Sequence, residues 1–168
     1  MIQSDLEKIF ADTFATYSDA IFRFCLLKVS SVELAEDMTQ EVFMRYWQSL
    51  RDGKEMTNTR SLLYTIANNL AKDWYKKKKS VSLETVLESG HQPSAEVVVS
   101  PENSASYQEV LAVIDDMDEH DKEVLFLTYV EGLEPKHIAQ MIDQTAGTVS
   151  VRLNRAIKRL KQKLHTHE

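Results

Sequence analysis

The sequence has a single cysteine, no long apolar run and almost no strand signals. A lone Cys25 cannot form an internal disulfide framework and agrees with a reducing compartment. No apolar run approaches the ~18 residues of a membrane-spanning helix. Residues 1–10 lack the basic region and apolar stretch of a secretory signal. We therefore expect an all-α protein of the cytoplasm, without membrane insertion.

The sequence also lacks the patterns of common catalytic and metal sites. Its histidines are dispersed, and the pair His165 and His167 has no accompanying cysteine or carboxylate cluster. No glycine-rich loop is present to hold a phosphate. The acidic run at 115–123 is explained more simply as an acidic helix start than as a carboxylate site. We predict no catalytic residue, no metal, no cofactor and no enzyme activity.

Charge is distributed unevenly along the chain. The net charge is −6, which by itself argues against a nucleic-acid-binding protein. However, residues 60–79 carry a net +5 and residues 147–165 a net +6, which leaves −17 on the remainder. Two concentrated basic segments on an acidic body indicate two separate polyanion-binding surfaces.

Apolar residues at helical spacing predict three helices in the first half of the chain. Ser30 and Glu33 have capping-box spacing at the start of the second helix. In that helix the polar residues Asp37, Gln40 and Glu41 lie opposite the apolar face. In the third, Leu63, Ile66, Ala67, Leu70 and Trp74 form the expected core stripe, and Thr65, Asn69, Lys72 and Lys76 repeat along another face. Solvated lysines at a helix end are also common, since they suit the helix dipole.

A change of composition divides the chain into two parts. Residues 80–106 are rich in Ser, Glu and Pro without a sustained period, which predicts a flexible linker. The segment is too long for an ordinary connection inside a compact domain. We therefore predict two small helical domains, 1–79 and 107–168.

The second domain has the spacing of a helix-turn-helix motif. Asp118 is a candidate N-cap for a helix that runs to Val130, and Gly132 is its expected stop. Pro135 suits the first turn of the next helix, Asp143 and Gln144 form a tight turn, and Thr145 caps the last helix.

In such a motif the second helix enters the major groove of DNA, and its first residues meet base edges. Arg pairs with guanine and Asn with adenine, whereas Lys and Ser mostly hold phosphate. The candidates for base contact are Ser150, Val151, Asn154 and Arg155, and the candidates for backbone contact are Thr148, Arg152 and Lys158. A plain helical hairpin with a solvated basic end is the alternative interpretation.

At this point the chain resembles a known family over nearly its whole length, the small two-domain extracytoplasmic-function (ECF) sigma factors of bacterial RNA polymerase. Residues 35–47 (AEDMTQEVFMRYW) are similar to the family's polymerase-binding helix. Residues 62–79 are similar to the adjoining helix, which melts and reads the −10 promoter element. Residues 123–161 are similar to its −35-binding helix-turn-helix.

The resemblance implies roles for particular residues. Asp37, Gln40, Glu41 and Phe43 would bind core polymerase at the clamp helices of its largest subunit, and the polymerase flap would be a further contact. Asn69 matches the position that helps hold a base flipped from the non-template strand. The cationic and stacking groups for the single-stranded −10 element would be Tyr64, Lys72, Lys76 and Lys77, with Trp74 and Tyr75 as further stacking candidates.

The resemblance further implies duplex DNA at −35 and an anti-sigma protein as partners. Two positions depart from the family pattern. Leu62 stands where a Trp is usual, and Asp143-Gln144 replaces the usual glycine and apolar residue of the turn; Asp tolerates the left-handed conformation. The alternative function is a stand-alone helix-turn-helix regulator whose first domain senses or dimerises, which would not need the polymerase-binding and strand-melting faces.

Overall fold

The computed structural model describes residues 3–54, 57–84 and 112–165, and within these the chain is helical without a strand. The all-α prediction is therefore confirmed. The chain separates into two compact units, Met1–Ala95 and Glu96–Glu168. The predicted linker, 80–106, lies largely outside the described residues. None of the described helices is both long and apolar enough to cross a membrane.

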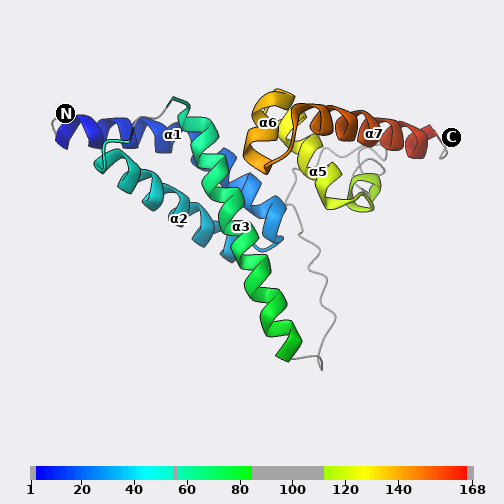
Figure 1. Ribbon diagram of the computed structural model, residues 1–168, viewed down its shortest axis with the longest axis horizontal. Helices are drawn as coiled ribbons and strands as arrows, with labels where there is room; N and C mark the ends of the chain where they lie inside the picture. The colour runs from blue at the N-terminus through cyan, green and yellow to red at the C-terminus, as the bar shows by residue number, and fades with distance from the viewer. Residues whose placement is uncertain (1–2, 55–56, 85–111, 166–168) are drawn as a thin grey trace, which may run out of the picture. The chain divides into compact units, whose positions relative to one another are not determined.

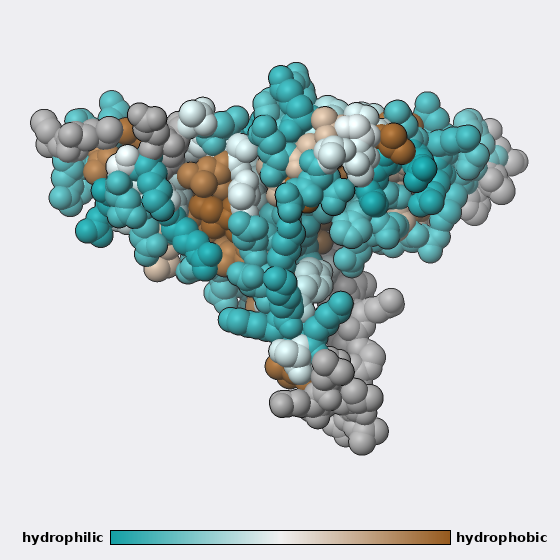
Figure 2. Space-filling view, in the orientation of Figure 1, coloured by the Kyte–Doolittle hydropathy of each residue, from teal (hydrophilic) through white to brown (hydrophobic). Residues whose placement is uncertain are grey.

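The first unit is a three-helix bundle of α1 (Gln3–Val29), α2 (Val32–Arg51) and α3 (Thr59–Glu84) (Figure 1). Its core contains large side chains from all three helices, including Phe24, Val42, Tyr46 and Leu63. The C-terminal half of α3 extends beyond the other two helices and is mostly hydrophilic in Figure 2. This helix ends five residues after Lys79, the predicted end of the first domain.

The connection between α1 and α2 uses two serines for different purposes. Ser30 has a positive φ of 52° and ends α1 by donating its backbone N–H to the Leu26 carbonyl at 2.9 Å. Ser31 is the N-cap of α2 and accepts from the Leu34 N–H at 3.4 Å. The predicted capping residue, Ser30, was therefore one position too early.

The second unit contains α5 (Glu119–Leu125), η1 (Phe126–Val130), α6 (Pro135–Ile142) and α7 (Ala146–His165). Asp118 caps α5 through the His120 N–H at 3.0 Å. Continuation of this helix to Val130 was predicted, but η1 is a π-helical turn in which the Glu131 N–H bonds to the Phe126 carbonyl at 3.1 Å.

The turn between α6 and α7 has the geometry expected of a helix-turn-helix. Asp143 is left-handed, with φ 55° and ψ 50°. Its polar neighbour Gln144 is exposed, so its polarity does not disturb the packing. Thr145 accepts from the Thr148 N–H at 3.1 Å, and Val149 and Ala156 place the inner face of α7 in the core. The predicted roles of Asp143 and Thr145 are confirmed.

Candidate polymerase and nucleic-acid interfaces

The outer face of α2 carries the predicted polymerase-binding polar residues. Asp37 and Gln40 are exposed, and Glu41 is partly exposed. The Glu41 carboxylate accepts a hydrogen bond from Arg45 Nε at 2.7 Å, one helical turn later. Met44 lies on the same face and is 58% exposed. Sequence reasoning missed Arg45, although its i, i+4 spacing from Glu41 is a readable signal.

Phe43 does not lie on this face with the polar residues. Its side chain is only 2% exposed, and its ring packs against Phe14 at 4.8 Å and edge-on to Phe10 at 6.2 Å between centroids. Phe43 therefore joins α2 to α1 and is not exposed like the polar residues predicted with it; its contact with polymerase stays a prediction. Phe43 is also one of the residues that line a groove of about 330 Å³, together with Glu7, Phe10, Met44 and Trp47.

The outer face of α3 carries the predicted −10 residues Asn69, Lys72 and Lys76, all exposed. Their spacing places them opposite the buried residues Ala67 and Ala71. Lys77 is also exposed, but the next position along a helix is turned by about 100°, so Lys77 lies to the side of this face. An amide and two ammonium groups on one solvent-facing surface can bind a base edge and neighbouring phosphates.

Tyr64 occupies the core side of α3. It is 0% exposed, and its ring meets Phe24 edge-on with 5.3 Å between centroids. This burial corrects the prediction that Tyr64 stacks on a base. The real core stripe contains Leu63, Tyr64 and Ala67, together with the buried amide of Asn68. It is therefore rotated from the predicted stripe, in which Ile66 and Leu70 were central.

The other stacking candidates lie where α3 leaves the bundle. Trp74 is half-buried, and its ring lies 4.9 Å from that of Tyr75 and 4.9 Å from Lys78 Nζ. The Tyr75 hydroxyl donates to the backbone carbonyl of Lys28 on α1. These contacts give both rings structural partners within the first unit.

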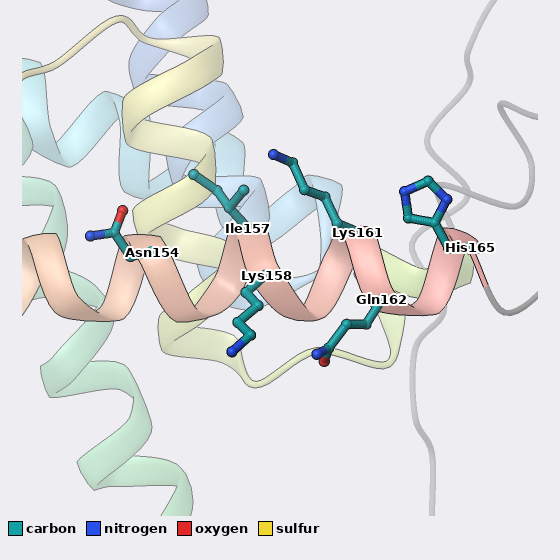
Figure 3. A pocket seen from close by; sticks show the side chains of 6 residues that line it. All are labelled: Asn154, Ile157, Lys158, Lys161, Gln162 and His165. Carbon is teal, nitrogen blue, oxygen red and sulfur yellow. The ribbon is translucent and has the colours of Figure 1, made fainter.

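The outer face of α7 carries Val151, Asn154, Arg155 and Lys158, all exposed. Figure 3 shows Asn154 and Lys158 among the six side chains that line a groove of about 810 Å³ along this helix, with Ile157, Lys161, Gln162 and His165. No ion pair involves Arg155, Lys158 or Lys161 within the described part of the chain. These cations are available to a polyanion.

Three other predicted −35 residues are placed differently. Thr148 is exposed, but its hydroxyl lies 2.8 Å from that of Thr145 in the helix cap, and Ser150 is half-buried. Arg152 points toward α5, where it pairs with Asp118 at 3.4 Å and Asp121 at 3.3 Å. Arg152 thus pairs with acids of its own unit, whereas the sequence predicts that it contacts the DNA backbone.

The acidic run at 115–123, which extends into α5, therefore pairs with basic residues of α7. Asp121, which is buried, also pairs with Arg159 at 3.0 Å, and Asp116 pairs with Lys163. The hydrogen bond from Lys163, with its charge, lowers the pKa of Asp116 below its usual value. These pairs join residues 31 to 47 positions apart, so no local spacing in the sequence could have revealed them.

Comparison with known protein families agrees with this arrangement. The family model for Sigma-70 region 2 matches residues 13–81, and that for Sigma-70, region 4 matches residues 107–160. Together they cover more than half of the chain. The ECF RNA polymerase sigma factor SigW of Bacillus subtilis is 27% identical over 92% of this chain and 88% of its own length. SigM of the same organism is 27% identical over 89% of this chain and 91% of its own length.

Two solved structures share the fold. The sigma factor RpoE of Bartonella quintana, in complex with the anti-sigma factor NepR, superposes with a TM-score of 0.68 at 22% identity, over 96% of this chain and 99% of that one. CnrH, in complex with the cytosolic domain of CnrY, gives a TM-score of 0.66 at 19% identity. This match covers 96% of this chain and 91% of CnrH. With both regions matched in order and with relatives aligned over nearly the whole chain, this protein belongs to the ECF sigma factors of bacterial RNA polymerase.

Proposed function

We propose that this sigma factor divides promoter-specific initiation among three surfaces. The face of α2 around Asp37, Gln40 and Glu41 binds the clamp helices of core polymerase. The face of α3 around Asn69 holds the opened −10 strand, and the outer face of α7 binds duplex DNA at −35. The protein acts in the cytoplasm as a non-enzymatic initiation factor.

The observation that carries this proposal is the position of the two basic faces. Asn69, Lys72 and Lys76 lie opposite a packed core stripe on α3, and Asn154, Arg155 and Lys158 do so on α7. A folded scaffold therefore presents each set without any need to open the core. An amide beside cations suits a base edge with its phosphates, which is the chemistry that promoter recognition requires.

An anti-sigma protein is a further expected partner. RpoE and CnrH were each solved with a partner, which in the RpoE structure is named as an anti-sigma factor. The exposed Met44 beside Asp37 and Gln40 gives the α2 face mixed apolar and acidic character. A partner that covered this face would prevent polymerase binding, so we infer that an anti-sigma protein competes for it.

A charge reversal tests the polymerase surface. Asp37→Lys should abolish co-elution of the full chain with core polymerase while helical content stays unchanged, because Asp37 is exposed. The matched control is Asp19→Lys, the same change at an exposed position of α1 in the same unit. Undiminished co-elution of Asp37→Lys, or equal loss in the control, would contradict the assignment.

A further inference from the structure

The basic residues of α7 fall into two groups that face different surroundings. Arg152, Arg159 and Lys163 recur at i, i+7 and i+11 and pair with acids of residues 116–121. Arg155, Lys158 and Lys161 lie on the outer face, where no acid of the described residues pairs with them. The helix period separates the two groups, so half of the Lys and Arg residues of α7 pair with acids of their own unit.

Asp121 is the centre of the group that pairs with acids. Its side chain is only 6% exposed, and its two oxygens accept from Arg152 at 3.3 Å and Arg159 at 3.0 Å. Asp118 adds a second carboxylate on Arg152 at 3.4 Å. A buried carboxylate is costly unless it is paired, so Asp121 needs these arginines, although their own side chains are 36% and 60% exposed.

We propose that Asp121 is a specificity-determining positioning residue that withholds Arg152 and Arg159 from DNA phosphate and fixes the rotation of α7 about its axis. The proposal rests on the proposed binding of duplex DNA by α7. It does not make Asp121 a DNA contact; Asp121 acts through the two arginines.

Withholding cations affects specificity because phosphate contacts contribute the same affinity to every sequence. Each phosphate that a cation neutralises steepens the dependence of log K on log salt by about 0.9. Two arginines released onto the backbone would therefore strengthen binding to all DNA. They would also loosen the rotation that presents Asn154 and Arg155 to base edges, so discrimination between sequences falls.

The test uses the full chain bound to core polymerase, on a promoter where it initiates and on the same duplex with a scrambled −35 element. Binding to each duplex is measured over a range of salt concentrations, at a temperature well below unfolding. These titrations give the slope of log K against log salt. They also give the discrimination ratio, which is the affinity for the promoter divided by the affinity for the scrambled duplex. For Asp121→Asn we expect tighter binding to the scrambled duplex, a slope steeper by about 1 to 2, and a discrimination ratio several-fold lower. An equal loss of affinity for both duplexes with an unchanged slope would show a merely structural role and overturn the proposal.

Two single variants keep the proposal testable if Asp121→Asn fails to fold. Arg152 is 36% exposed in its side chain, so Arg152→Gln should fold, and we expect its salt slope to equal that of the wild type. Lys158→Gln, on the outer face, should lower the slope by about 1. A drop for Arg152→Gln equal to that for Lys158→Gln would refute the proposal. An unchanged slope for Lys158→Gln would instead refute DNA binding by the outer face of α7.

Discussion

Two adjacent asparagines on α3 separate the strand-melting role from the folding of the first unit. Asn69 is exposed, whereas Asn68 is 2% exposed and belongs to the core. Asn69→Ala should change the free energy of unfolding by no more than about 0.5 kcal/mol, as for other surface substitutions. Asn68→Ala should cost roughly 1–3 kcal/mol because buried polar groups that it contacts lose a partner.

On promoter opening, in contrast, we expect the large effect from Asn69→Ala. If Asn69 holds an extruded base, Asn69→Ala removes one or two hydrogen bonds that form only after the strands separate. At about 0.5–1.5 kcal/mol each, their loss lowers the fraction of open complex by roughly 2- to 150-fold. Recruitment of polymerase and binding to the closed promoter should be unaffected, because we propose that those steps use α2 and α7.

Permanganate footprinting of thymines near the start site measures opening, and thermal unfolding measures stability. A promoter made single-stranded over the −10 element should recover part of the activity of Asn69→Ala, because the unstacking cost of a few kcal/mol is already met. Equal opening by wild type and Asn69→Ala would remove Asn69 from the site. A large loss of stability in Asn69→Ala would refute its placement on the outer face.

Further predictions follow from burial and capping in the first unit. Tyr64→Ala should lower the free energy of unfolding by about 3–5 kcal/mol, and a near-neutral result in denaturant titration would contradict its burial. Ser31→Ala should lower the free energy of unfolding by about 1 kcal/mol. Ser30→Gly should raise it by up to about 1 kcal/mol, because glycine adopts a positive φ without strain. If Ser30→Gly were the destabilising change and Ser31→Ala were not, Ser30 would be the cap. Burial raises the pKa of the Cys25 thiol from 9.0 to about 11, with a hydrogen bond to Thr39 partly opposing this. The neutral thiol therefore stabilises the fold fully below about pH 9, and this contribution is lost as the pH rises through about 11. The stability difference between wild type and Cys25→Ala should narrow over that range, and a constant difference would contradict the buried thiol.

Local chemistry made the turns and caps of the second unit predictable. Asp118, Asp143 and Thr145 have roles that depend on the conformation of one or two residues, and each is where the sequence predicts it. In the first unit the predicted cap Ser30 was wrong, because its neighbour Ser31 offers the same hydroxyl one position later. Two adjacent capping residues are not distinguishable by side-chain chemistry alone.

Positions that depend on neighbouring helices could not be predicted in the same way. Tyr64 and Phe43 are aromatic residues near polar faces, and only the packing of Phe24 and Phe14 of α1 against them places both inside. Arg152 has the spacing of a DNA contact, but its partners are acids more than 30 residues away. The helical period predicts on which face of its helix a residue lies. It does not predict which residues of other helices pack against that face.

The most direct test of the account is transcription of fragmented genomic DNA from the organism that encodes this protein, with that organism's core polymerase and the purified full chain. Sequencing the 5′ ends of the transcripts locates each start. We expect starts that depend on the added chain and share one pair of upstream elements near −35 and −10. Transcripts that are absent, or whose starts share no upstream elements, would contradict promoter-specific initiation by this chain.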